Sequence, residues 1–408
     1  MYKMADEILE KWMRLFNMRS FCNEVPGQIL FHVLLGQKLK DLKVYTKPGK
    51  WIDLRIHFGH LQDSGSGKGE ELEFELEMAK RLKLKTESLG GSVTDAALLS
   101  NNKRAGILSQ KDIVCYPEAR VLFDPNKWNS EIREILIAVM EPLGSEGNKY
   151  FKKLGGYEEG VITQSSASLV FTTRPISNVR GEIPAVGHLQ RAIFYPRELD
   201  NKTRQEMDKK NIEMLSNGKI EWQKESKELA DEIDNICQKA IVNNLRISNE
   251  TEFLKELQLK NIKFSQKISE ISDKEDKGIL HTFTARYTDQ ILKLAFHHAV
   301  MRESSNVEIV DLEYAFELIW KVFEQLCLWV EIVIEKDWRK VSDREIKLKQ
   351  IKSWIEWLEK NKGKATLSDL AKFYAKKYGR TEMAGRLFIE QHAEEIGFKI
   401  PEEEIKEK

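Results

Sequence analysis

A glycine-rich turn with a single lysine carries the most chemical information in this sequence. Apolar residues alternate from 54 to 58 and predict a buried strand, while residues 70 to 84 have the apolar spacing of a helix. The turn between them consists of Asp63, Ser64, Gly65, Ser66, Gly67 and Lys68. Backbone N–H groups freed by glycine, a helix N-terminus and a lysine all attract phosphate. The turn therefore predicts a phosphate site, and a Gly/Ser surface loop is the alternative.

Two positions differ from the consensus G-x-x-x-x-G-K-[ST]. Gln62 stands where the first glycine belongs, and Gly69 stands where the consensus has serine or threonine. The hydroxyl at that last position usually ligates Mg²⁺. Other segments of the chain must therefore decide between a phosphate site and a surface loop.

Two later strands end in residues suited to the same chemistry. A buried strand within residues 106 to 119 ends in Glu118, about 50 residues after Lys68, where P-loop enzymes place an acid that polarises water or orders Mg²⁺. An ordinary strand-ending glutamate is the alternative, and Pro117 replaces the usual aspartate before it. The strand from Ser168 ends in Thr173 and Arg174, either of which would lie beside a γ-phosphate.

Alternating strands and helices must position these residues. They predict an α/β fold with a parallel sheet, whose ligands bind at the carboxyl ends of the strands. The predicted divisions are a helical N-terminal segment (1–45), the α/β core (46–205), an all-helical lid (206–338) and a winged-helix-like domain (339–408). The charged helical stretch from 201 to 280 is the least informative.

Two segments carry basic residues suited to DNA. A predicted hairpin from 148 to 165 carries Lys149, Lys152 and Lys153, beside two aromatic residues. These lysines could equally form a solvated surface. The predicted helix-turn-helix near the C-terminus carries Lys376, Lys377, Arg380 and Arg386. Such a domain binds either DNA or a protein partner.

The amino-acid composition limits the classes of protein to which this chain could belong. The 65 basic and 65 acidic residues cancel, so any DNA binding must come from local patches. The four cysteines form no C-x-x-C pair, which argues against a disulfide framework or zinc site and predicts a reducing, cytoplasmic location. No segment has the pattern of a signal peptide or membrane span, so a membrane partner is not expected.

Residues 51 to 335 resemble the ATPase core of minichromosome-maintenance (MCM)-type AAA+ helicases. They are most similar to the shortened versions carried by archaeal viruses, plasmids and integrated elements. The resemblance rests on the order of short segments, which are the turn ending at Lys68, 91–97, 106–118, 134–141, 160–175, 189–194, 284–292 and 309–318. The large N-terminal DNA-binding region of full-length members has no counterpart before residue 51.

The resemblance implies a role for each matching residue. Lys68 would hold the β- and γ-phosphates of ATP, with Mg²⁺, and Glu118 would activate the attacking water. Thr173 or Arg174 would sense the γ-phosphate. Arg191 would be the arginine finger that reaches a neighbouring subunit's ATP, and Arg286 the sensor-2 arginine. A finger acting in trans implies a homo-oligomer, expected to be a hexamer, with single-stranded or forked DNA in its channel.

Three functions follow from these observations. The first is a DNA-dependent ATPase, a replicative helicase or replication-initiation motor. The second is an AAA+-fold scaffold that binds DNA or a replication partner without turning over ATP, as Gly69 and Pro117 suggest. The third is a DNA-binding regulator that acts through its C-terminal domain, which the long ATPase-like core argues against. Motif order favours the first.

Overall fold

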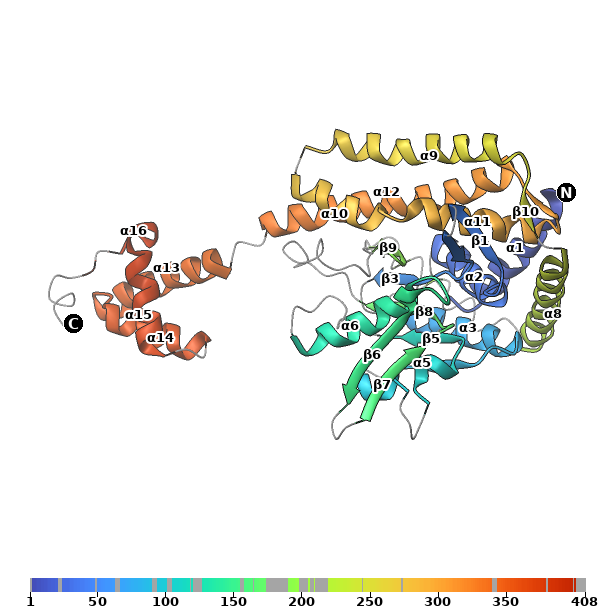
Figure 1. Cartoon of the computed structure of the whole chain (residues 1–408). Coiled ribbons are helices and arrows are strands. Elements are labelled where there is room, and N and C mark those ends of the chain that lie inside the picture. Colours follow the sequence, from blue (N-terminus) through green and yellow to red (C-terminus); the bar gives the residue numbers. More distant parts are fainter. Residues whose placement is uncertain are drawn as a thin grey trace. The chain divides into compact units, whose positions relative to one another are not determined.

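The computed structural model of the chain forms two compact units, Met1–Glu331 and Ile332–Lys408 (Figure 1). The structure describes residues 2–400 apart from 21–23, 48–49, 63–66, 90–93, 101–104, 118, 120–126, 155–157, 164, 174–189, 198–204, 206–208, 210–218, 244, 273, 340–342, 379–380 and 399. The predicted N-terminal segment and α/β core lie wholly within the first unit, together with most of the predicted lid.

A five-stranded parallel sheet forms the centre of the first unit. Its strands are β3 (Phe58–Gln62), β4 (Thr86–Ser88), β5 (Ile113–Tyr116), β8 (Ser168–Thr173) and β9 (Ile193–Arg197). They lie in the order β4-β5-β8-β3-β9, and every neighbouring pair is parallel. Every residue of β3, β5 and β8 is buried, as expected for central strands of a parallel sheet that is covered on both faces. The predicted α/β class with a parallel sheet is confirmed.

The first strand of this sheet lies later in the chain than the sequence predicts. The alternating residues Leu54, Ile56 and Phe58 are all buried, but the strand begins only at Phe58. The N–H of Arg55 donates to the Asp53 carboxylate, and its carbonyl accepts from Lys293. Because these contacts occupy the backbone of Arg55, sheet pairing begins only after it, where the His57 carbonyl accepts from the Ile193 N–H of β9 at 2.8 Å. The preceding strands β1 (Lys43–Lys47) and β2 (Lys50–Asp53) pair instead with each other.

Helices from distant parts of the chain pack around the sheet. Two of them precede the sheet in the chain, α1 (Tyr2–Asn17) and α2 (Glu24–Lys38). Two lie between its strands, α3 (Lys68–Arg81) and α6 (Lys127–Met140), and α8 (Lys219–Asn243) follows its last strand. The Trp12 ring of α1 lies edge-on to Phe31 of α2 and to Phe74 of α3. Its indole N–H also donates to the Gly27 carbonyl, 2.8 Å away. A single aromatic side chain thus joins three helices.

The later helices form a layer of their own in the first unit (Figure 1). They are α9 (Glu250–Glu270), α10 (Lys274–Thr284), α11 (Tyr287–Met301) and α12 (Ile309–Arg339). The first unit ends within α12, at Glu331, so the last residues of this helix belong to the second unit. Phe264 of α9 contacts the rings of Phe316, Trp320 and Phe323 of α12. These contacts hold the two long helices together.

Several short elements complete the first unit. They are α4 (Asp95–Leu98), α5 (Ile107–Gln110), the 3-10 helix η2 (Glu146–Asn148), β10 (Arg246–Ile247) and β11 (Asn306–Val307). The predicted hairpin is confirmed as the antiparallel pair β6 (Lys149–Leu154) and β7 (Glu158–Thr163). Figure 1 shows it projecting from the body of this unit.

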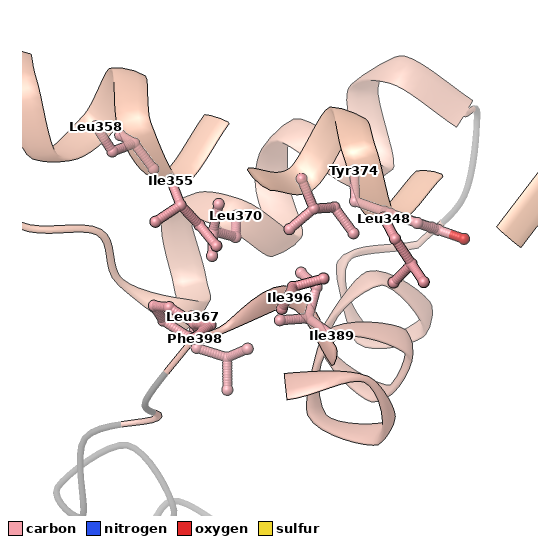
Figure 2. Close-up of a cluster of buried hydrophobic side chains, with 10 residues drawn as sticks. Leu348, Ile355, Leu358, Leu367, Leu370, Tyr374, Ile389, Ile396 and Phe398 are labelled. Carbon is pink, nitrogen blue, oxygen red and sulfur yellow. The ribbon is translucent and has the colours of Figure 1, made fainter. Parts of the chain in front are cut away.

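The second unit is helical throughout its described residues. Besides the end of α12, its helices are α13 (Asp343–Lys362), α14 (Leu367–Tyr378), α15 (Glu382–Gln391) and α16 (Ala393–Ile396). Figure 2 shows their shared core, in which Ile355, Leu370 and Ile389 meet the C-terminal Ile396 and Phe398. The described residues therefore include the two consecutive helices α14 and α15 of the predicted helix-turn-helix but no strand that would form a wing.

Candidate functional site

The predicted phosphate turn leads directly into α3. Gly67 has φ 79° and ψ 6°, a left-handed conformation that glycine adopts without steric cost, and the helix begins at Lys68. The Lys68 side chain is largely buried, and its ammonium donates to the carbonyl of Gln62, the last residue of β3, at 3.3 Å. The predicted residues Ser64, Gly65 and Ser66 lie outside the described residues. Lys68 is thus positioned at the carboxyl end of the strand.

Thr173 lies at the same edge of the sheet as Lys68. It is the last residue of β8, and in the parallel register it is opposite Leu61 of β3, one residue before Gln62. The neighbouring strand β5 ends at Tyr116, which is opposite Phe171 of β8. The predicted residues Glu118 and Arg174 follow these two strands but lie outside the described residues.

A buried ionisable pair anchors the start of α3 beneath the turn. His60 of β3 and Glu71 of α3 are both almost fully buried, and His60 Nδ1 lies 2.6 Å from Glu71 Oε2. One turn further along, Glu75 is also fully buried, and burial raises the pKa of its carboxyl group well above the ordinary value. Burial thus favours the neutral form of Glu75. These side chains fix the face that α3 presents to the sheet.

The two predicted arginines meet on one carboxylate. Arg191 Nε donates to Glu141 Oε1 at 2.6 Å, and Arg286 Nη1 and Nη2 donate to Glu141 Oε2 and Oε1 at 3.2 and 3.1 Å. The exposed fractions of the Arg191, Arg286 and Glu141 side chains are 13%, 29% and 15%. Burial alone would raise the pKa of Glu141, but the two guanidinium groups lower it. Glu141 therefore stays ionised and holds the arginines side by side.

This arginine pair lies at the opposite edge of the sheet from Lys68. Arg191 precedes β9, whose last residue, Arg197, is opposite Gln62 in the parallel register. Five strand residues extend for about 16 Å, so β9 separates Arg191 from the edge that carries Lys68. Those predicted nucleotide-site residues that the structure describes therefore fall into two groups, with Lys68 and Thr173 at the carboxyl edge and Arg191 and Arg286 at the amino edge.

A buried arginine, Arg55, stabilises the backbone at the amino edge of the sheet, including that of Glu141. Arg55 is fully buried and binds both carboxylate oxygens of Asp53 at 2.9 and 3.0 Å. Its guanidinium also donates to four backbone carbonyls, those of Val139, Glu141, Ser165 and Ala167. Burial alone would raise the pKa of Asp53, but the charges of Arg55 and Lys293 and its hydrogen bonds lower it far below the ordinary value. Asp53, Arg55 and Glu141 were not predicted from the sequence, because their partners include residues distant in the chain.

The predicted DNA-binding residues lie in three places. Lys149 begins β6 and pairs with Glu146 at 2.7 Å. Lys152 and Lys153 lie in β6 opposite Gly160 and Glu159, and their side chains are outside the described part of the structure. In the second unit, Lys376 and Lys377 are exposed on α14, Arg386 of α15 pairs with Glu390 at 3.2 Å, and Arg380 lies outside the described residues.

Comparisons with known proteins do not extend these observations. No protein-family model matches the chain, and no curated protein matches its sequence. Among the described residues, no group of three or more His, Cys, Asp or Glu side chains is placed to hold a metal ion. Within the same residues, every helix is too short or too polar to cross a bilayer.

Proposed function

We propose that this chain is an ATP-dependent DNA motor with an AAA+ core of the MCM type, a helicase or replication-initiation ATPase. The single observation that carries the proposal is the placement of Lys68 after a left-handed glycine, at the carboxyl end of the sheet's buried strand β3. Thr173 at the end of the adjacent strand adds a hydroxyl at the same edge. In open α/β sheets, ligands bind outside the carboxyl ends of the strands.

The strand order supports a P-loop core over other nucleotide-binding folds. In dinucleotide-binding and flavodoxin-like sheets, the first two strands along the chain are neighbours. Here β5 and β8 lie between β3 and β4. Strand β8, which carries the proposed sensor Thr173, is thereby placed next to the strand of the phosphate turn, the position expected of a sensor strand in the AAA+ cores that this chain resembles.

The residues around the turn fit the phosphates of ATP better than they fit Mg²⁺. The α3 N-terminus, the left-handed Gly67 and the Lys68 ammonium are all suited to an anion. Gly69 contributes no hydroxyl and is exposed, and among the described residues nothing beyond its chain neighbours and its own helix backbone lies within 4 Å of the place where a Cβ would lie. When bound with the phosphates, Mg²⁺ would neutralise charge on the oxygens of the transferring group.

Replacing Gly69 with threonine should therefore improve catalysis. The open space accepts the side chain, and its hydroxyl would supply the Mg²⁺ ligand of the consensus. An added contact to a charged group contributes about 1.5–3 kcal/mol, so the Mg²⁺ concentration for half-maximal ATP hydrolysis should fall about tenfold or more. Gly69→Ala is the matched control, since it adds a Cβ without the hydroxyl. Equal effects of the two substitutions would contradict a role for the hydroxyl.

The arginine pair supports action between subunits. Arg191 and Arg286 are at the amino edge, so β9 keeps them from the phosphates that Lys68 of the same chain would hold. If they stabilise a transferring phosphoryl group, the nucleotide must belong to a neighbouring copy. Glu141 would hold both guanidinium groups in position until that neighbour binds.

Mixing two inactive variants should restore activity if this arrangement is correct. Lys68→Ala disables its own nucleotide site but keeps Arg191, whereas Arg191→Ala keeps Lys68 but cannot serve its neighbour. In randomly mixed rings, about a quarter of the interfaces combine an intact Lys68 with an intact Arg191. ATP hydrolysis by the mixture should therefore rise well above that of either variant. Mixing Lys68→Ala with Glu118→Gln is the control, because both residues belong to the same site and no rescue is expected. Absence of rescue in the first mixture would contradict action in trans.

The proposed function itself is tested by ATP hydrolysis with and without single-stranded DNA. We expect DNA to stimulate turnover and Glu118→Gln to abolish it. A second function, a scaffold that binds DNA without turnover, is favoured specifically by Gly69 and Pro117. DNA binding without any ATP hydrolysis would support the scaffold and contradict the motor.

A further inference from the structure

An aromatic strip lies on the surface of the second unit, across α13 and α14. Phe373 of α14 is placed between two tryptophans of α13, with ring centroids 5.7 Å from Trp354 and 5.9 Å from Trp357. Trp354 and Phe373 are partly buried and pack against the core of the unit. Trp357 is 51% exposed, which is unusual for the largest apolar side chain.

Trp357 is not needed to fill the core of this unit. The core residues of α13 include Ile355 and Leu358, which Figure 2 shows facing the other helices. Trp357 lies about 200° around the helix from Ile355. Its indole therefore leaves one face open beside Phe373.

Lysines accompany this strip on both helices. On α13, Lys360 lies one turn beyond Trp357, and on α14, Lys376 and Lys377 lie one turn beyond Phe373. All three are exposed, and within the described part of the second unit they form no ion pair. The acid one turn before Phe373, Asp369, pairs with Lys362 at 3.3 Å. The strip thus combines exposed aromatic surface with three lysines for which the described residues of this unit provide no ion-pair partner.

The exposed face of α15, the helix that follows α14, is acidic and apolar instead of basic and aromatic. Its exposed face carries Glu382, Met383 and Leu387, and its arginine, Arg386, is paired with Glu390. Such a face lacks the free basic groups that a helix in the major groove uses to bind phosphates. The positive and aromatic surface of this unit is instead on α13 and α14.

We propose that the strip of Trp357 and Phe373, with Lys360, Lys376 and Lys377, binds single-stranded DNA by stacking a base on Trp357. Aromatic faces flanked by lysines are the pattern of single-strand binding, since every base offers a face and every nucleotide a phosphate. The inference rests on the proposed function only in taking DNA as the ligand, and it makes no use of the nucleotide site. It adds Trp357, Phe373 and Lys360 to the predicted lysines of α14.

The test compares two labelled strands bound by the full chain, measured by fluorescence anisotropy. One is a 20-nucleotide thymidine strand, and the other is an abasic strand with the same phosphates. Trp357→Ala should weaken binding of the thymidine strand by about fivefold to a hundredfold, since stacking on one aromatic side chain carries this much affinity. Binding of the abasic strand should stay within twofold. Lys376→Gln with Lys377→Gln should weaken both strands and reduce the dependence of affinity on salt.

Two further variants separate stacking from loss of structure. Trp357→Phe keeps an aromatic face and should retain most of the affinity, and Met383→Ala removes exposed apolar surface elsewhere on the unit and should change nothing. Unchanged thymidine-strand affinity in Trp357→Ala, or an equal loss for both strands, would overturn the inference and leave the proposed function standing. Failure of the wild-type chain to bind either strand would overturn both. Trp357-dependent binding by a chain that hydrolyses no ATP would support the inference alone.

Discussion

Lys68→Ala should lower ATP turnover of the full chain by about a hundredfold or more, because it removes the cation that is proposed to hold the phosphates. Gly67 and the Gln62 carbonyl hold Lys68 in place at the carboxyl edge of the sheet. Truncation removes only the tail of a residue at the first position of α3, so the fold should persist. Steady-state phosphate release, measured at saturating ATP and Mg²⁺, checks the result.

The matched control for this variant is Lys80→Ala. Lys80 lies in the last turn of the same helix and is exposed, so its loss removes a positive charge from α3 without touching the turn. Its turnover should equal that of the wild-type chain. If Lys68→Ala keeps half of the wild-type turnover, the turn is not the catalytic phosphate site.

Arg55→Met should destabilise the first unit severely, by about 3–5 kcal/mol in the free energy of unfolding. The substitution leaves Asp53 buried without its cation and deprives four backbone carbonyls of their donor. Urea unfolding followed by circular dichroism measures the change. Arg14→Met is the matched control, because Arg14 is exposed where it pairs with Glu225, and its loss should cost about 1 kcal/mol or less.

The Asp53–Arg55 pair should also make the stability of the first unit depend on pH, with stability falling as the pH falls. The folded-state pKa of Asp53 is lowered, so the stability that the pair contributes is present above the ordinary aspartate pKa of about 3.9 and is lost as the pH falls below it. The wild-type chain should therefore lose more stability than Arg55→Met between pH 5 and pH 3. A loss below about 1 kcal/mol for Arg55→Met at pH 7, or identical pH profiles, would contradict a structural role for the pair.

Local signals in the sequence predicted the parts of the fold that depend on neighbouring residues. The start of the helix just after Gly67, the buried strands and the β6–β7 hairpin follow from glycine positions and apolar runs, which act within a few residues. The predicted start of β3 was wrong because Lys293, which occupies the Arg55 carbonyl, is 238 residues away in the chain. No local pattern carries such a contact.

The arrangement of the candidate site could not be predicted from the sequence either, because it also depends on contacts between segments that are distant in the chain. Arg191 and Arg286 were selected individually, but no role was predicted from the sequence for their shared partner Glu141. The burial of Glu75 could not be predicted either, since a glutamate on a helix ordinarily faces water. Only the packing of α3 on the sheet encloses the Glu75 side chain. Such residues become visible only when the sheet order brings distant segments together.

Equilibrium binding of ATP to the purified wild-type chain, in the presence of Mg²⁺, tests the central claim most directly. Isothermal titration calorimetry would give both the affinity and the number of sites. We predict saturable binding at one site per chain, abolished by Lys68→Ala and retained by Lys80→Ala. Absence of binding by a folded wild-type chain, or binding that Lys68→Ala leaves unchanged, would contradict the assignment of this turn as a nucleotide site.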